Sequence, residues 1–203
     1  DRVGLLSQVK LPILCYPNYG IESLTFDAER RWIWTATEST PKMWGKAADA
    51  LNRLCNRVPL MAFDDSLKWQ GMAVYQMDAP IARHAAQWYA IGVSELCAIG
   101  RGRLLVLERE LYVPQRKIGA WVSNKLYCTD SVCLGDTMPV GKYMVHAWKT
   151  KFNLTNHSFA NYEGMCLGPH LKDGSQTIIL VADSQNRYKH LLKDWFCTLV
   201  VRL

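Results

Sequence analysis

Long apolar runs, low-complexity tracts and a high charge content are all missing from this chain of 203 residues. A membrane-spanning helix requires roughly 18 consecutive apolar residues, and the longest runs here, such as residues 177–182, have only the length of a strand. Hydrophobic residues make up 49% of the chain and charged residues only 21%, a balance that is typical of folded proteins. We therefore expect one compact domain over residues 1–203, with a hydrophobic core and no membrane span.

A strong charge bias is also missing. The chain has 24 Lys and Arg residues against 18 Asp and Glu residues, which gives a net charge of +6. The basic residues are scattered, and no nucleic-acid-binding motif accompanies them. A small positive excess favours an anionic partner by electrostatic steering. We expect a small anionic substrate and no nucleic-acid partner, and the oligomeric state stays open.

The motifs of zinc and nucleophile chemistry are absent as well. The seven cysteines lack C-x-x-C spacing, the five histidines form no H-E-x-x-H motif, and there is no G-x-S-x-G elbow. Cys128 and Cys133, which a short turn separates, form either a local disulfide or two free thiols. The sequence therefore predicts neither a structural zinc site nor the nucleophile elbow of a serine hydrolase.

Short apolar or alternating runs, separated by Gly, Pro, Asn and Asp, recur along the chain and are typical of an all-β protein. The Ala-rich segment Met43–Cys55 follows Pro41 and predicts one inserted helix. We predict strands at residues 3–10, 21–26, 31–37, 58–63, 71–77, 93–99, 103–109, 118–127, 143–149, 162–167, 177–182 and 195–202.

The strands follow a plan that occurs three times. GIESL at residues 20–24, GVSEL at 92–96 and NYEGM at 161–165 each begin a strand, which a turn connects to a second strand that ends in an acid. Repeats of this kind, about 70 residues apart, predict a β-propeller-like fold of three four-stranded blade units. The third unit shows only three strands, and the strand at residues 3–10 is left over. Because a propeller needs at least about four blades, we expect part of a larger propeller, with a sandwich or a dimer of half-rings as the alternative.

The repeated acids are the candidate functional residues. The innermost strand of each blade lines the channel of a propeller, so acids at these strand ends would lie near the axis. Carboxylates that gather there can coordinate a divalent cation such as calcium or act as general acid and base. Glu22, Glu95 and Glu163 begin the first strands, whereas Glu38, Glu108 and Asp183 end the second strands.

The register of the repeat is imperfect. Alignment of the three units places Glu22 and Glu163 at one position, where the second unit has Ser94. Glu95 is displaced by one residue and would face the other way unless a bulge intervenes. Each single acid could also be a solvated strand end. Arg109 and Arg187, which follow the acidic strand ends, could hold a phosphate or could neutralise the neighbouring acids.

These blocks resemble the phytase-like family that is described as esterase-like activity of phytase. Its members carry a G-[IF]-E-[GS]-L strand with an ATE ending, a G-V-S-E-L block with GRLLVLERE, and a closing N-x-E-G-M-x-x-G-P-x-L-x-D-G segment followed by LVxDxN or a near variant of it. Here they read GIESL with TATES, GVSEL with GRLLVLEREL, and NYEGMCLGPHLKDG with LVADSQN, and together they span residues 20–187. KIGAWVSNKLY at residues 117–127 is similar to the bacterial members.

The resemblance implies a β-propeller-like domain of a secreted or periplasmic bacterial protein that hydrolyses phosphoesters or esters. The family domain is longer than this chain, so we expect its N-terminal blades to be missing here. Within this interpretation Arg109 and Arg187 hold an anionic group, and calcium is bound by Glu22, Glu163 and Glu95. The catalytic residues are Glu22, Glu38, Glu108, Glu163 and Asp183, which bind a divalent cation or polarise water. The alternative is a non-catalytic module that binds a sugar or protein ligand with the same fold.

Overall fold

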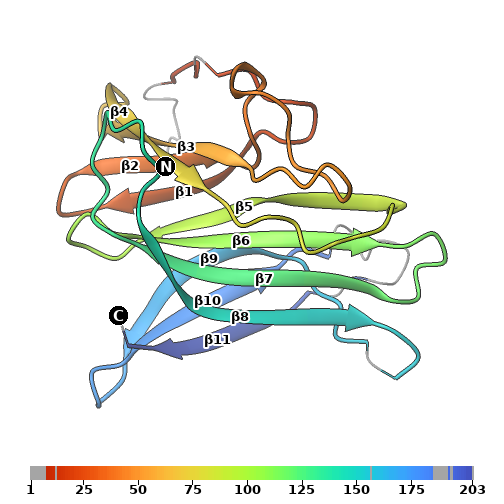
Figure 1. Ribbon diagram of the computed structural model, residues 1–203. Helices are drawn as coiled ribbons and strands as arrows, with labels where there is room; N and C mark the ends of the chain where they lie inside the picture. Colours follow the sequence, from red (N-terminus) through yellow and green to blue (C-terminus); the bar gives the residue numbers. More distant parts are fainter. Residues whose placement is uncertain (1–7, 12, 156, 185–191, 193, 203) are drawn as a thin grey trace, which may run out of the picture.

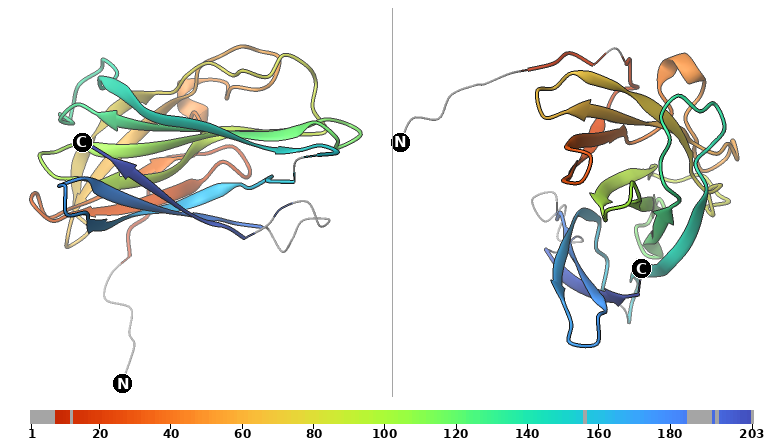
Figure 2. Two further views of the ribbon diagram at one scale, coloured as in Figure 1. Left: turned by 90° about the horizontal axis from the view of Figure 1, so that it is seen from below. Right: turned by 90° about the vertical axis from the view of Figure 1, so that its left-hand side faces the viewer.

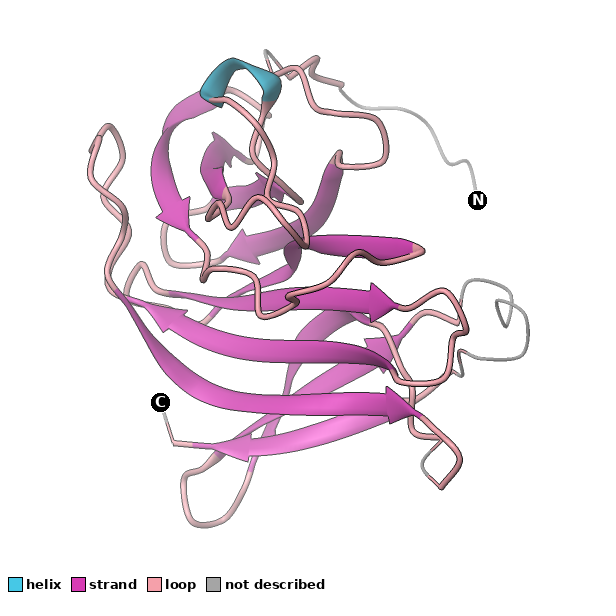
Figure 3. Cartoon of the chain, turned by 45° about the vertical axis from the view of Figure 1, so that its right-hand side comes forward, coloured by secondary structure: helices cyan, strands magenta, loops and turns pink. Residues whose placement is uncertain are grey.

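A computed structural model of the chain describes residues 8–11, 13–155, 157–184, 192 and 194–202 (Figure 1). Strands and their connecting loops account for almost all of this part of the chain, and the single helix drawn is the short 3₁₀ helix η1 (Lys42–Trp44) (Figure 3). Across the described residues, no helix has the length and apolarity that a membrane span requires.

The strands form three antiparallel sheets in which sequence neighbours pair. The first sheet contains β1 (Ile21–Asp27), β2 (Trp32–Thr37), β3 (Arg57–Asp64) and β4 (Trp69–Gln76). The second sheet contains β5 (Trp88–Ala98), β6 (Leu104–Val113), β7 (Ala120–Thr129) and β8 (Lys142–Phe152). The third sheet contains β9 (Tyr162–His170), β10 (Gln176–Ala182) and β11 (Phe196–Val201).

The three sheets pack side by side with their first strands innermost. Strand β5 contacts β1 on one side and β9 on the other, and Figure 2 shows the sheets arranged around these inner strands. The backbone N–H of Val93 in β5 donates to the carbonyl of Glu38 at the end of the first sheet, at 2.9 Å. The prediction of an all-β, propeller-like fold is therefore confirmed.

Two hydrophobic cores hold the sheets together. Leu60, Tyr75 and Leu104 are among the buried residues between the first and second sheets. Leu107, Leu126 and other buried residues fill the space between the second and third sheets. Side chains alternate between the faces of a strand, so β6 supplies both cores and must be apolar on both sides. This is why LLVL in β6 reads as a continuous apolar run.

Two strand predictions need comment. The third sheet has three strands among the described residues, as the strand count indicated, whereas the first and second have four each. The predicted strand at residues 3–10 lies mostly outside the described residues, and its described part, residues 8–10, is not a strand.

The predicted helix at Met43–Cys55 is wrong. Only Lys42–Trp44 forms a helical turn, and the rest of the segment is irregular. The cause is a buried asparagine: the Asn56 amide oxygen accepts hydrogen bonds from the Ala48 N–H at 2.7 Å and from the Thr40 hydroxyl at 3.1 Å. Side-chain bonds of this kind replace the backbone bonds that a helix would need.

The described cysteines, Cys128 and Cys133 included, are free thiols.

Candidate functional site

A cavity of about 540 Å³ lies where the innermost strands begin and the second strands of the three sheets end. Its volume is in the range of cavities that bind small organic ligands. All three sheets and the loops beside them contribute to it. The lining residues are Pro17, Asn18, Tyr19, Glu22, Glu38, Trp88, Tyr89, Ala90, Arg109, Leu111, Val113, Phe159, Glu163, Asp183 and Leu192.

Five of the predicted site residues line this one cavity although they are far apart in sequence. The second predicted anion-binding residue, Arg187, lies outside the described residues. The carboxylates thus come from the first and third sheets, and the cation comes from the second sheet between them. The five are Glu22, Glu38, Arg109, Glu163 and Asp183.

The Arg109 guanidinium joins the three sheets. Its Nη2 donates to Oε1 of Glu38 in the first sheet. Its Nη1 donates to Oδ1 of Asn161 at 3.0 Å and to Oε1 of Glu163 at 3.2 Å, both next to or in the third sheet. The Asn161 amide nitrogen in turn donates to Glu163 Oε1 at 2.5 Å. Arg109 is only 6% exposed, so these contacts are shielded from water and strengthened.

A β-bulge occurs at the same place in each innermost strand. One residue in β1, one in β5 and one in β9 has no partner on the second strand, and the register shifts by one around it. The unpaired residues are Glu22, Ser94 and Glu163, the same three that the alignment of the units placed at one position. A bulge re-aims the side chain that it carries. This explains how two acidic strand residues come to line one cavity.

The second strands also share one register. In each sheet, the residue that precedes the bulged residue pairs with a residue of the second strand. The next residue along that second strand is Glu38 in the first sheet, Arg109 in the second and Asp183 in the third, so these three are structurally equivalent. The second sheet therefore supplies a cation at the position where its neighbours supply acids. The ion pairs of Arg109 with Glu38 and Glu163 arise from this one difference among the three repeats.

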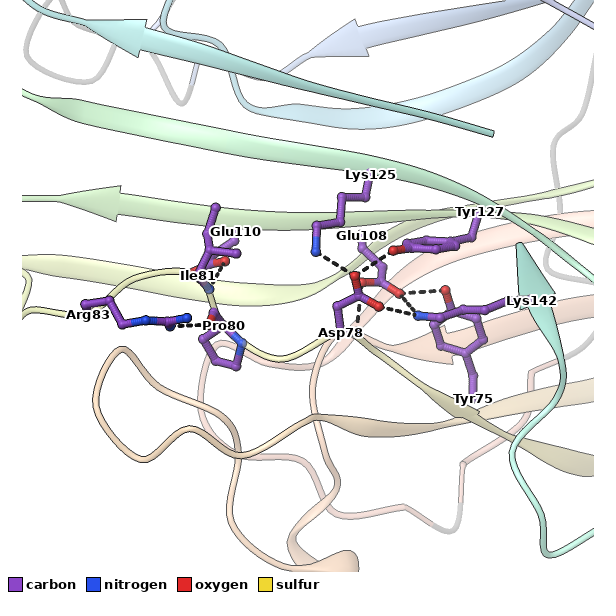
Figure 4. Close-up of polar contacts among 10 residues, drawn as sticks. All are labelled: Tyr75, Asp78, Pro80, Ile81, Arg83, Glu108, Glu110, Lys125, Tyr127 and Lys142. Atoms are coloured by element: carbon purple, nitrogen blue, oxygen red, sulfur yellow. Dashed lines mark hydrogen bonds and ion pairs between the residues drawn. The ribbon is translucent and has the colours of Figure 1, made fainter. Parts of the chain in front are cut away.

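Glu108 does not line the cavity, which corrects its predicted place. It lies one residue before Arg109, and a shift of one residue turns a side chain to the opposite face of the strand. Glu108 faces the first sheet, where its Oε1 accepts from the Tyr75 hydroxyl at 2.7 Å and from Lys142 Nζ at 2.5 Å (Figure 4). Asp78 binds the same lysine at 3.2 Å and Lys125 at 2.6 Å. We call Tyr75, Asp78, Glu108, Lys125, Tyr127 and Lys142 the Asp78–Glu108 network.

Glu95 also lies outside the cavity. Its Oε1 accepts hydrogen bonds from the backbone N–H of Leu24 at 3.2 Å and of Leu96 at 2.9 Å. It therefore connects β5 to β1. The bulge that could have re-aimed it exists, but the unpaired residue is Ser94, so Glu95 keeps the orientation that the imperfect register predicted.

Burial and mutual repulsion change the acidity of two cavity carboxyls. Burial, together with the charges of Glu22 and Glu163, raises the pKa of Glu38 to about 7, although Arg109 acts in the opposite direction. Burial and the charge of Asp183 likewise raise the pKa of Glu163, again against the effect of Arg109. Glu38 therefore exchanges its proton near neutral pH, which is the property of an efficient general base or acid.

Sequence reasoning missed two kinds of residue at this site: a buried residue that supports the charged side chains, and the aromatic residues of the cavity wall. Asn161 stands in the NYEGM block but was not selected, although it is fully buried and binds both Arg109 and Glu163. Its position directly before the acidic strand start was the available signal. The aromatic walls were also missed because their residues lie in loops or at strand ends with no shared motif. The aromatic lining residues are Tyr19, Trp88, Tyr89 and Phe159.

The fit of a metal ion can be judged from the donor set. Carboxylate oxygens are the ligands that calcium prefers. However, no group of three or more His, Cys, Asp or Glu side chains within the described ranges is arranged to hold a metal ion. Two of the four cavity carboxylates are instead bonded to Arg109. The described side chains as arranged thus do not form a calcium site.

Comparison with known proteins gives one match. A family model with the description "Phytase-like: Esterase-like activity of phytase" matches residues 15–185. This range contains the charged residues that line the cavity, which are Glu22, Glu38, Arg109, Glu163 and Asp183. No curated protein and no solved structure matches the chain.

Proposed function

The chain belongs to the phytase-like family, and from this premise we propose that its cavity hydrolyses esters, phosphoesters among them. The family description points to a hydrolase. Glu38 is the residue that we assign to the chemistry, and Arg109 and Asn161 are the residues that hold it in place. The observation that carries the proposal is the buried Glu38 carboxyl group in the wall of a cavity of ligand size, where burial raises its pKa to about 7.

The reaction needs a base for water and an acid for the leaving group. Ionised Glu38 would take a proton from a water molecule as the water oxygen bonds to the carbonyl carbon or phosphorus. Protonated Glu38 would then return that proton to the alcohol oxygen as the ester bond breaks. Arg109 is the cation that lines the cavity among the described residues, so it would face the negative charge that develops on the substrate oxygen.

Charge limits which esters can enter. Four carboxylates line the cavity with one described cation, so a phosphate group would meet repulsion unless further positive charge accompanies it. Calcium stays a prediction for this reason: an ion that arrives with the substrate would supply the missing charge. A neutral carboxylic ester has no such requirement. The response to calcium therefore separates the two substrate classes.

The test uses the purified chain with p-nitrophenyl acetate and p-nitrophenyl phosphate, each with calcium and with a chelator. Hydrolysis should rise with pH through about 7, because Glu38 must be ionised to act as base. Glu38→Gln should lower kcat by about 10²- to 10⁴-fold. Glu95→Gln is the matched control, because it alters an acid outside the cavity and should leave kcat unchanged. A Glu38→Gln variant with full activity on the substrate that the wild type hydrolyses would contradict the proposal.

A second candidate is a non-catalytic module that binds a sugar. Four aromatic residues line the cavity beside the polar cluster, and aromatic faces with a few polar groups suit carbohydrate or other ring-shaped ligands. Under this alternative neither ester is hydrolysed in any condition. Ligand binding would instead raise the unfolding temperature of the wild type but not of Trp88→Ala.

A further inference from the structure

Three side chains on one face of the second sheet, one of them the cavity-lining Arg109, carry polar atoms that have no hydrogen-bond partner among the described residues. Arg109, Asn124 and Trp148 lie in one row across β6, β7 and β8, since Arg109 pairs with Asn124 and Asn124 pairs with Trp148. The unpartnered atoms are Nε of Arg109, both amide atoms of Asn124 and Nε1 of Trp148. Asn124 is fully buried.

Buried polar atoms in native proteins almost always have a partner, either in the protein or in ordered water. Leaving one unpaired costs the free energy of removing that group from water, and no new bond offsets this cost. The neighbours of Arg109 and Asn124 on the same face of β6 and β7, which are Leu107, Leu126 and Val122, are apolar and offer no donor or acceptor in their side chains. Opposite side chains in an antiparallel pair have Cβ atoms about 4.5–5.5 Å apart, so their polar ends are near enough to share a bridging water molecule.

We propose that this row is a buried water site and that Asn124 is a positioning residue for Arg109. One water molecule accepts a hydrogen bond from Arg109 Nε–H and donates one to Asn124 Oδ1. A second accepts from Asn124 Nδ2–H and from Trp148 Nε1–H. Asparagine suits this place because it offers an acceptor toward the arginine and a donor toward the tryptophan.

The water site completes the support of the guanidinium. The two terminal nitrogens of Arg109 already bond Glu38, Asn161 and Glu163, and the water fixes the remaining Nε–H. The plane of the guanidinium, and with it the ion pair to Glu38, is then set from both sides. The effect of Asn124 on catalytic turnover rests on the proposed function, whereas its effect on the pKa of Glu38 does not.

The first experiment detects the water directly. In NMR spectra of the whole chain, the side-chain N–H signals of Arg109 and Trp148 should show cross-relaxation with long-lived water, and Trp148→Phe assigns the indole signal. A crystal structure at high resolution should show the two ordered water molecules. A direct hydrogen bond between Arg109 Nε and Asn124, with no water between them, would overturn the proposal.

The second experiment removes the amide. Asn124→Leu keeps the branched shape of the side chain but abolishes the water site, so the ion pair to Glu38 should loosen and the pKa of Glu38, measured by NMR titration, should rise above its wild-type value. Asn124→Ser, which keeps a polar group and leaves space for another water molecule, should restore it. Thr129→Val removes a buried hydrogen bond to Leu104 elsewhere on β7 and should leave the pKa of Glu38 unchanged.

The outcomes separate the two proposals. If the wild type hydrolyses an ester, kcat/KM of Asn124→Leu should fall about 10- to 100-fold, as expected for a displaced catalytic group. If the wild type hydrolyses neither ester and the pKa of Glu38 still rises in Asn124→Leu, the proposed function fails and the positioning role stands. An unchanged pKa in Asn124→Leu overturns the positioning role whether or not the protein is an enzyme.

Discussion

At the scale of single residues, the cavity is organised around one cation among acids. Arg109 bonds Glu38 and Glu163, and burial prevents water from replacing it. Breaking a buried ion pair from one side leaves a charge without a partner, which costs more than the pair itself contributes. The stability of the fold and the acidity of Glu38 therefore both depend on this guanidinium.

Arg109→Met should destabilise the protein by about 3–5 kcal/mol near pH 8. The loss should be smaller near pH 5, because Glu38 and Glu163, whose pKa values are already raised, can bind protons there and no longer need a cation. Urea unfolding at the two pH values measures the difference. Arg109→Lys keeps the charge but not the planar guanidinium group, so its free energy of unfolding should lie between those of Arg109→Met and the wild type. A loss that is equal at both pH values would contradict this account.

At the scale of the strand and sheet, close approach of two sheets places Glu38. Gly92 in β5 lies against the end of the first sheet, and a Cβ atom added there would lie 2.6 Å from the Glu38 carbonyl oxygen and would also meet the Glu38 side chain. Gly20 is the corresponding residue of the first sheet, and an added Cβ there meets nothing within 4 Å. A side chain is thus sterically excluded at Gly92 but not at Gly20, although the two glycines are equivalent in their repeats.

Gly92→Ala should therefore destabilise the protein by about 1–3 kcal/mol, because the two sheets must move apart to admit the methyl group. Because Glu38 moves with the first sheet, any ester hydrolysis should fall as well. Gly20→Ala is the matched control and should change neither property. Thermal unfolding and an ester assay of the two variants provide the test, and equal behaviour of the two would argue against close packing at Gly92.

The strands and repeats could be predicted from sequence, whereas the register between the paired strands of each sheet could not. Alternating apolar residues predicted β1 to β11 within a few residues, and the alignment of the units placed Glu22, Ser94 and Glu163 correctly. The sequence offered Glu108 as the acid at a strand end, but the structural equivalent of Glu38 is its neighbour Arg109. Only the position of the bulge reveals this shift, and a bulge depends on pairing between strands rather than on local composition.

At the scale of the whole molecule, the Asp78–Glu108 network holds the first and second sheets together. Burial alone would raise the pKa of Asp78, but hydrogen bonds from Lys125 and Tyr127 and the charge of Lys142 outweigh it and lower that pKa to about 2. Because the unfolded chain binds the proton more tightly, this carboxylate stabilises the fold above the ordinary pKa of aspartate, and the stabilisation is lost as pH falls toward 2.

Asp78→Asn should consequently lower the unfolding temperature at pH 7 by a few degrees. The difference from the wild type should shrink as the pH is lowered from about 4 toward 2, where Asp78 becomes protonated in both states. Asp65→Asn is a suitable control, because Asp65 pairs with Arg31 on the exposed surface and such pairs contribute little. A pH-independent difference for Asp78→Asn would show that the charge of this group is not what matters.

Secretion or a periplasmic location, bacterial origin and membership of a larger ring of blades stay predictions. Each depends on parts of the sequence pattern or on the resemblance, and none depends on the geometry of the cavity. The fold class and the family are established independently of them.

The position of Arg109 between three sheets has a consequence for how the protein folds. The arginine bonds one residue 71 positions away in sequence and another 54 positions away, so both contacts require long chain loops to close. Each sheet can form from neighbouring strands, but the charged cluster exists only once all three sheets have docked. A chain that stalls with two sheets in place would have most of its secondary structure but not the complete set of ion pairs around Arg109.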